Sequence, residues 1–286
     1  MANPRADFVP IVDRRHLALP DGLRVAAMLV VNVEQKQFRE PVGSPLSQTG
    51  NLHLPEVPQF SLFEYGLRVG IWRILEATKH MDVMASMTLN GSVGDSYPGV
   101  VEACMRAGWD PVGHGYYQVP LNLVNDERME IKRTLSAIER QTGKRPQGWL
   151  GPGLHETFDT PDVLAELGVK FVLDWVNDDQ PYPMKVKSGS LTSLPYSNEI
   201  NDIGIYVRSG HKAPEMLDRV DASLATLLTD TPETARILPN AIHPFIMGQP
   251  HRFQTFVKIL EVIKNHPGVA FMTASQIYEW YAKATS

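Results

Sequence analysis

The chain has 286 residues, of which 43% are hydrophobic and 21% are charged, and its formal net charge is −5. This composition is ordinary for a soluble globular protein, and the acidic balance argues against a nucleic-acid-binding protein, which presents a basic surface. No stretch approaches the roughly 18 consecutive apolar residues that cross a bilayer, which argues against a membrane protein.

The N-terminal segment, residues 1–20, carries scattered charges and no apolar core. We interpret it as an N-terminal arm and not as a signal peptide. The single cysteine, Cys104, excludes an intrachain disulfide and suits a reducing compartment. Its apolar surroundings favour a buried structural thiol over a nucleophile. Together these features predict a cytoplasmic protein.

The first predicted element is a buried strand over residues 23–33. Its centre, Val25 to Val31, is almost entirely apolar, as in strands that are covered on both faces. The strand ends in Asn32-Val33-Glu34, and α/β proteins collect their active sites at the carboxyl ends of strands. A long proline-rich connection, residues 35–58, follows, and we expect it to lie over the site.

An amphipathic helix is predicted next, over residues 62–80, with Leu67, Ile71 and Ile74 on its apolar side. Further elements alternate at a spacing that suits β-α-β crossover units. Strands are predicted at 83–89, 112–114, 146–150, 171–175, 194–198, 235–242 and 269–272, and helices at 100–107, 126–142, 161–167, 214–228, 252–266 and 273–284. Without a repeat or a break in composition, residues 1–286 indicate a single α/β domain with a parallel, barrel-like fold; the alternative is a doubly wound open sheet.

Polar residues gather at four of the predicted strand ends. They are Asn32 with Glu34, His114 with Gln118, Asp174 with Asp178 and Asp179, and His243. The glycines on either side of His114 leave its imidazole little cover, which is typical of a site. Because strand ends converge in a closed barrel, the clusters predict one polar site at the carboxyl edge of the sheet.

Several sequence strings become specific when they are taken together. They are Phe63-Glu64-Tyr65-Gly66 with Gly70-Ile71-Trp72-Arg73, Gly113-His114-Gly115-Tyr116, Gly148-Trp149, and Gly248-Gln249-Pro250-His251-Arg252. With the polar clusters in this order, the chain from about Val25 to Trp280 resembles the polysaccharide deacetylase (NodB-homology) family. Two branches look closest: the allantoinase-like and cyclic imide hydrolases, which these strings support, and the intracellular-type peptidoglycan deacetylases. The resemblance implies a deformed (β/α) barrel, mostly parallel, that hydrolyses a carbon–nitrogen bond.

The chain departs from the pattern of the metal-using members. In those, the first strand supplies a catalytic base and a metal-binding aspartate, and two histidines four residues apart complete the site. Here Asn32 stands at the base position, Glu34 at the aspartate position, His114 at the first histidine and Gln118 at the second. A carboxamide is a poor zinc ligand, and an asparagine cannot accept a proton as a base. The resemblance leaves a zinc ion on Glu34, His114 and Gln118 open, but it favours no cofactor, because some allantoinase-like members dispense with the metal.

The expected catalytic residues are Glu34, His114 and His243. Glu34 is the candidate base, provided that burial raises its pKa, while His114 orients the water and His243 protonates the leaving nitrogen. The turn Gly151-Pro152-Gly153 offers backbone donors to the oxyanion, apart from Pro152, which has no N–H group.

A further set of residues is expected to bind substrate. It comprises Asn32, Gln118, Tyr65, Arg68, Trp149, Gly151, Asp174, Trp175 and Arg252. Core packing is an equal alternative for the two tryptophans, and Asp174 could instead orient His243. For Asn198 and Asp202, which follow a predicted strand, ordinary turn chemistry is preferred.

Three functions remain open. The first is a hydrolase of a small cyclic amide, imide or ureide (allantoinase-like or cyclic imide hydrolase) that needs no metal. The second is an N-acetyl deacetylase of a sugar or glycan with a metal site, for which an aspartate and a histidine are missing. The third is an inert binding protein, which is disfavoured because burying three polar groups without chemistry is costly. We expect a small-molecule substrate as the partner, no nucleic acid or membrane, and a homo-oligomer (dimer or tetramer).

Overall fold

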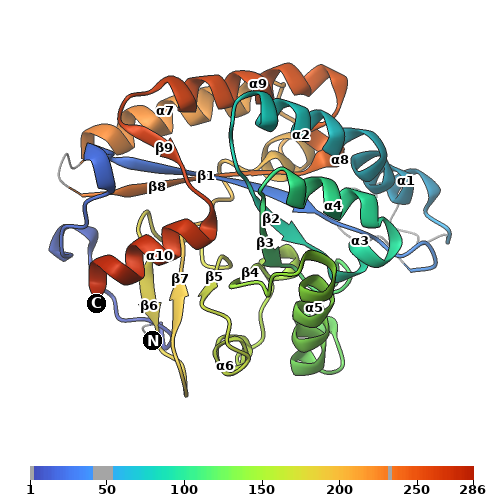
Figure 1. Cartoon of the computed structure of the whole chain (residues 1–286), viewed down its shortest axis with the longest axis horizontal. Coiled ribbons are helices and arrows are strands. Elements are labelled where there is room, and N and C mark those ends of the chain that lie inside the picture. The colour runs from blue at the N-terminus through green and yellow to red at the C-terminus, as the bar shows by residue number, and fades with distance from the viewer. Residues whose placement is uncertain (1–2, 41–53, 231–233) are drawn as a thin grey trace.

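The computed structural model describes residues 3–40, 54–230 and 234–286. Over these residues one curled sheet runs in the order β6-β7-β5-β4-β3-β2-β1-β8, and β9 also pairs with β1. The pairings are parallel except the one between β6 and β7. Helices lie outside the sheet (Figure 1). The expected deformed, mostly parallel barrel is therefore confirmed.

The strands are short apart from β1 and β8. They are β1 (Val25–Val33), β2 (Ser86–Leu89), β3 (Asp110–Gly113), β4 (Gly148–Trp149), β5 (Phe171–Val172), β6 (Tyr182–Met184), β7 (Leu191–Ser193), β8 (Arg236–Ile242) and β9 (Val269–Phe271). The helices are α1 (Val57–Tyr65), α2 (Ile71–His80), α3 (Gly91–Ser96), α4 (Pro98–Arg106), α5 (Glu127–Thr142), α6 (Thr160–Glu166), α7 (Glu215–Asp230), α8 (Pro244–Met247), α9 (Pro250–Asn265) and α10 (Ala274–Thr285). No helix in the described ranges is long and apolar enough to span a bilayer.

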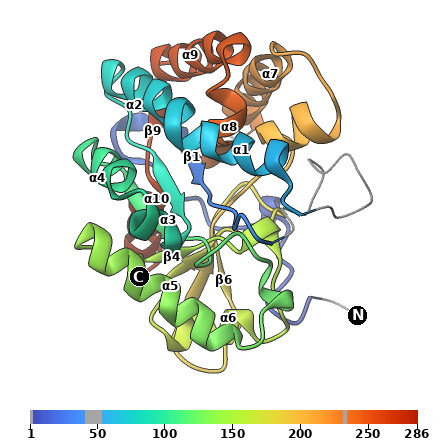
Figure 2. The same ribbon diagram turned by 90° about the vertical axis from the view of Figure 1, so that its right-hand side faces the viewer.

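Strand β1 is buried along its whole length, as its continuous apolar run predicts. Its odd-numbered residues, such as Leu29, pack into one cluster with α2 and α9 residues, among them Ile71 and Phe256. Its even-numbered residues, such as Met28, face the barrel interior with Leu150 of the loop after β4. Figures 1 and 2 show α2, α7 and α9 on the same side of β1 and β8. The core thus fixes β1 from both faces and aims its carboxyl end at the site.

The helix predicted over residues 62–80 is present, but it contains a π-helical turn, Gly66–Gly70, between α1 and α2. A Cβ atom at Gly70 would lie 2.0 Å from the carbonyl oxygen of Pro244. The backbones of this turn and of α8 therefore touch, and only glycine permits that distance. The contact supports α8 directly after His243.

The prediction of a strand over residues 194–198 is wrong. The strand in this region, β7, ends earlier, at Ser193. Pro195 has no N–H group with which to continue the hydrogen-bond ladder of the sheet. The chain leaves the sheet there, so Tyr196 and Asn198 belong to a loop and not to a strand.

Candidate active site

The carboxyl ends of the central strands bring the three expected catalytic residues together. Glu34 follows β1, His114 follows β3 and His243 follows β8, and all three are buried. They line one cavity of about 730 Å³. The convergence predicted from the strand ends is therefore present for these three residues.

His243 is held by two carboxylates. Its Nδ1 lies 2.6 Å from Oδ1 of Asp202, its backbone N–H donates to Oδ2 of the same residue at 2.7 Å, and its Nε2 lies 3.5 Å from Oε1 of Glu34. A ring whose two nitrogens both face carboxylates carries a proton on each. Burial lowers the pKa of His243, but the charges of Asp202 and Glu34 prevail and raise it to about 10. The ring is therefore an imidazolium at neutral pH.

Glu34 is ionised. Burial raises its pKa, but the charge of His243 and its hydrogen bond with the carboxylate outweigh burial and hold the pKa well below its usual range. The expected role of Glu34 as base requires a raised pKa, and its pKa is lowered instead, so this condition is not met. The carboxylate instead lies between two imidazoles, 3.3 Å from Nε2 of His114 and 3.5 Å from Nε2 of His243.

The tautomer of His114 follows from its contacts. Its Nδ1 lies 2.6 Å from the carbonyl oxygen of Leu150, and a carbonyl can only accept, so Nδ1 carries the hydrogen. In the neutral ring Nε2 then presents a lone pair. The side-chain nitrogen of Gln118 lies 3.1 Å from this Nε2 and donates to it. His114 is thus built to accept a proton.

A chain of hydrogen bonds fixes which way the Gln118 carboxamide points. The backbone N–H of Gln35 donates to Oδ1 of Asn90 at 2.8 Å, and Nδ2 of Asn90 donates to the carbonyl oxygen of His114 and, at 3.0 Å, to Oε1 of Gln118. The N–H of Gln35 can only donate and the carbonyl of His114 can only accept, so these two groups fix the orientation of the Asn90 amide. The Asn90 amide in turn fixes that of Gln118, whose Nε2 faces Glu34 and donates to it at 2.8 Å.

A zinc ion does not fit this arrangement. Glu34 and His114 offer one oxygen and one nitrogen, but the third group that faces them is the N–H of Gln118, a donor where a metal needs a lone pair. Among the residues that the structure describes, no three His, Cys, Asp or Glu side chains are placed to hold a metal ion.

Asn32, at the position of the family's base, is held as a structural group. Its Nδ2 donates to the carbonyl oxygen of Ile242 at 3.1 Å, and its Oδ1 accepts from the Thr88 hydroxyl at 2.7 Å. It lines the cavity as expected, but its side chain ties β1 to the neighbouring strands and offers no base.

The residue that orients His243 is Asp202 and not Asp174, the candidate from the sequence. The buried Asp174 lies behind the turn after β4, and its Oδ1 accepts from the Gly151 N–H at 2.6 Å. That N–H is therefore not free for an oxyanion. Since Pro152 has none, Gly153 is the remaining residue of the turn that could offer a backbone N–H to an oxyanion.

Six residues of the expected binding set do not line the cavity. They are Tyr65, Arg68, Trp149, Asp174, Trp175 and Arg252. Tyr65 accepts from Arg73, Trp175 donates to Glu156, and Arg252 stacks over the Tyr206 ring with 4.8 Å between guanidinium and centroid. Trp149 is fully buried in the core. Aromatic and arginine residues near a motif were thus poor indicators of pocket lining.

Sequence reasoning missed three residues that shape the site. Asp202 was assigned to turn chemistry, although an acid after a strand is a common partner for a catalytic histidine. Asn90, which directly follows β2, gave a strand-end signal like that of His114. Lys36, in the connection after Glu34, also lines the cavity.

The connection over residues 35–58 is described in part. Lys36, Gln37 and Glu40 line the cavity, which agrees with a loop over the site. Residues 41–53 of this predicted loop lie outside the described residues.

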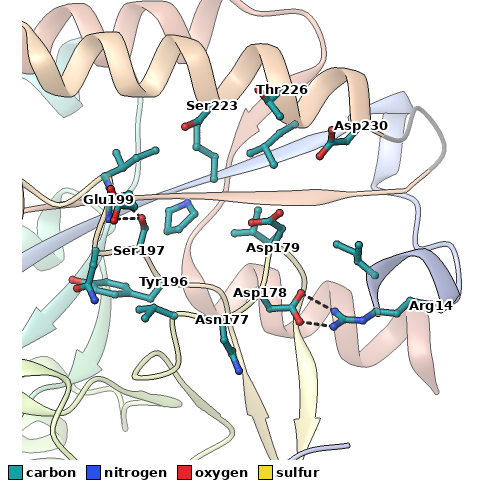
Figure 3. Close-up of a pocket in the computed structure, with 18 of the residues that line it drawn as sticks. Arg14, Asn177, Asp178, Asp179, Tyr196, Ser197, Glu199, Ser223, Thr226 and Asp230 are labelled. Carbon is teal, nitrogen blue, oxygen red and sulfur yellow. Dashed lines mark hydrogen bonds and ion pairs between the residues drawn. The ribbon is translucent and has the colours of Figure 1, made fainter. Parts of the chain in front are cut away.

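A second cavity, of about 950 Å³, lies between the N-terminal arm, α7 and the loops after β5 and β7 (Figure 3). Asp178 and Asp179 line it, and Asp178 accepts two hydrogen bonds from Arg14. This part of the third predicted cluster therefore does not join the catalytic cavity. Tyr196 lines both cavities, whereas Glu34, His114 and His243 line only the first.

Comparison with known proteins supports the expected family. Residues 58–172 match the family model "Polysaccharide deacetylase". A Schizosaccharomyces pombe protein named "Putative polysaccharide deacetylase" is 28% identical over 92% of this chain and 92% of its own. These matches agree with the expected family: the model covers residues 58–172, and the relative aligns over most of the chain.

Two solved structures share the fold. A Pseudomonas aeruginosa PAO1 protein titled "probable Polysaccharide deacetylase" has a TM-score of 0.88 at 21% identity, covering 95% of each chain. PuuE allantoinase has a TM-score of 0.85 at 22% identity, covering 94% of each chain. At these identities the likeness concerns the fold, and it does not distinguish the two branches.

Proposed function

We propose that the chain hydrolyses the carbon–nitrogen bond of a small cyclic amide, imide or ureide, without a metal ion. One observation carries the proposal: the Gln118 carboxamide bridges Glu34 and His114 where a third metal ligand would have to stand. The fold shared with an allantoinase supports this substrate class. Such a ring is more electrophilic than an acetamide, so its carbonyl needs less activation.

The reaction needs a proton acceptor for the attacking water. His114 takes this role, because its Nδ1–H is fixed on the Leu150 carbonyl and its Nε2 therefore carries the lone pair. The attacking water displaces the Gln118 N–H group from this lone pair. Water attacks the ring carbonyl carbon as His114 accepts its proton. Glu34, 3.3 Å away, stabilises the imidazolium that forms. In this proposal Glu34 therefore acts as a counter-charge and not as the base that the sequence indicated.

The reaction also needs a proton donor for the leaving nitrogen. His243 supplies it, since its Nδ1–H is held by Asp202 and its Nε2–H faces Glu34 and the cavity. The tetrahedral intermediate collapses as the carbon–nitrogen bond breaks, and the nitrogen takes the proton of His243. Glu34, between the two rings, balances positive charge on either, so a proton can return from His114 to His243.

The deacetylase of a sugar or glycan is the second candidate, because the Schizosaccharomyces pombe and Pseudomonas aeruginosa proteins are both named polysaccharide deacetylases. The donor set argues against the metal-assisted form of that reaction, as Gln118 presents an N–H group.

The test is hydrolysis of a panel by the purified protein: succinimide, hydantoin, dihydrouracil, allantoin and N-acetylglucosamine oligomers. Ring opening, lost in His114→Gln and His243→Gln, is the expected result. Deacetylation of the oligomers without ring opening would overturn the proposal.

A further inference from the structure

Lys36 is a charged residue of the catalytic cavity that takes no part in the proposed chemistry. Lys36 follows Glu34 by two residues, is half-buried, and lines the cavity. Its Nζ donates to the carbonyl oxygen of Gln118 at 3.0 Å and lies 5.6 Å from the centroid of the Phe63 ring. The ammonium group is therefore held in place beside the residue that bridges Glu34 and His114.

The ammonium group of Lys36 carries three N–H donors, and among the described residues the carbonyl of Gln118 accepts one of them. The negative charges of Glu34 and Glu56 also act on this group. A full charge that is partly removed from water is costly unless an anion or strong acceptors meet it. A neutral ring carbonyl would need only a neutral donor, whereas a carboxylate would match the charge.

The rest of the cavity agrees with an anionic ligand that also has an apolar face. Phe63, Leu123, Leu154 and Ile203 line its apolar part. Of its charged lining residues, the cations Lys36, Arg208 and His243 outnumber the carboxylates Glu34 and Glu40 by one. Arg208 and Glu40 are both exposed, so they lie where water screens them, and Lys36 is the half-buried cation beside the reacting groups.

We propose that Lys36 determines specificity by binding a carboxylate, so that the substrates are cyclic amides, imides or ureides that carry a carboxylate substituent. The inference rests on the proposed function and narrows its substrate class. The ring packs on the apolar lining, its reacting carbonyl lies at His114 and His243, and its carboxylate meets the ammonium group of Lys36.

The experiment compares two isosteric substrates, hydantoin-5-acetate and the neutral hydantoin-5-acetamide. We expect the wild-type protein to prefer the acetate in kcat/KM by about 10- to 100-fold, the range for one hydrogen bond to a charged group. Lys36→Met should abolish this preference, chiefly by raising KM for the acetate, and Lys36→Arg should retain part of it. Lys132→Met, on the charged helix α5 and away from the cavity lining, is the matched control.

The outcomes separate the two proposals. A wild-type protein that opens the acetamide as well as the acetate contradicts the inference alone, and so does a Lys36→Met variant that slows both substrates equally. A wild-type protein that opens neither ring contradicts the proposed function. In that case calorimetric titration tests the inference about Lys36 without turnover. Tighter binding of the acetate than of the acetamide, lost in Lys36→Met, would support the inference, and equal binding of the two compounds would overturn it. Thermal unfolding of each variant establishes that it is folded.

Discussion

The side-chain nitrogen of Gln118 lies 2.8 Å from Oε1 of Glu34 and 3.1 Å from Nε2 of His114. One neutral carboxamide thus joins two groups that the metal-using relatives would turn toward a cation. The pair explains how a polysaccharide deacetylase-type barrel can keep its polar cluster in place without a third metal ligand. A substitution at Gln118 alone should therefore change whether this cluster binds a metal ion.

Replacing Gln118 by histidine should create a metal site. The imidazole would add a lone-pair donor to Glu34 and His114, which completes a three-residue ligand set of the type that zinc uses. We expect Gln118→His to bind one zinc ion per chain, and the wild-type protein to bind none, in elemental analysis after dialysis. Gln118→Asn, which keeps a carboxamide, is the control. Equal zinc in all three proteins would show that Gln118 does not decide metal binding.

Removing the carboxylate behind His243 should impair its role as acid. Asp202→Asn keeps the size of the side chain but removes the charge that raises the pKa of His243. We expect kcat to fall by about 10²- to 10⁴-fold, the usual contribution of general acid–base catalysis. The alkaline limb of the pH–rate profile should also move to lower pH. Asp218→Asn, at an exposed position of α7, should change neither quantity, and an unmoved alkaline limb in Asp202→Asn would refute the assignment.

The raised pKa of His243 has a consequence for stability. Because its pKa rises from 6.5 to about 10 on folding, the folded chain binds this proton more tightly than the unfolded chain. The stabilisation is complete below pH 6.5 and is lost as the pH rises through about 10. Urea denaturation should therefore show the free energy of unfolding of the wild-type protein declining toward that of His243→Gln over this interval. Parallel pH profiles for the two proteins would contradict it.

The backbone contact at Gly70 should be sensitive to a single methyl group. A Cβ there would lie 2.0 Å from the carbonyl oxygen of Pro244, whereas nothing lies within 4 Å of a Cβ at Gly99. Gly70→Ala should lower the free energy of unfolding by about 1–3 kcal/mol, as overpacking does, and should lower kcat by displacing His243. Gly99→Ala, in helix α4, should lose neither stability nor activity. Comparable urea midpoints for the two variants would show that the backbone around Gly70 and Pro244 shifts to accommodate the methyl group.

Much of the fold could be predicted from the sequence, because its signals are local. The apolar run Val25–Val31 marked a strand that is buried on both faces, and periodicity placed most helices within a few residues of their bounds. The strand expected at 194–198 failed because Pro195 ends the hydrogen-bond ladder. The π-helical turn at Gly66–Gly70 depends on a contact with α8, which lies far away in the sequence.

The site could be predicted less completely. Residues directly at strand ends, Glu34, His114 and His243, converge because parallel strands share one edge. Asp202 and Lys36 lie in irregular segments, whose course depends on tertiary contacts. The pKa of Glu34 was out of reach for the same reason, since it is set by the distances to two histidines that only the fold brings near.

We propose above that the protein hydrolyses a cyclic carbon–nitrogen bond without a metal ion. This is tested by the rate of ring opening of the best cyclic substrate by the wild-type protein, measured before and after exhaustive chelation and again after zinc is added back. Metal-free hydrolysis should proceed at the same rate in all three conditions. A rate that disappears on chelation and returns with zinc would contradict it, and would assign a metal to Glu34 and His114 in spite of the Gln118 N–H group.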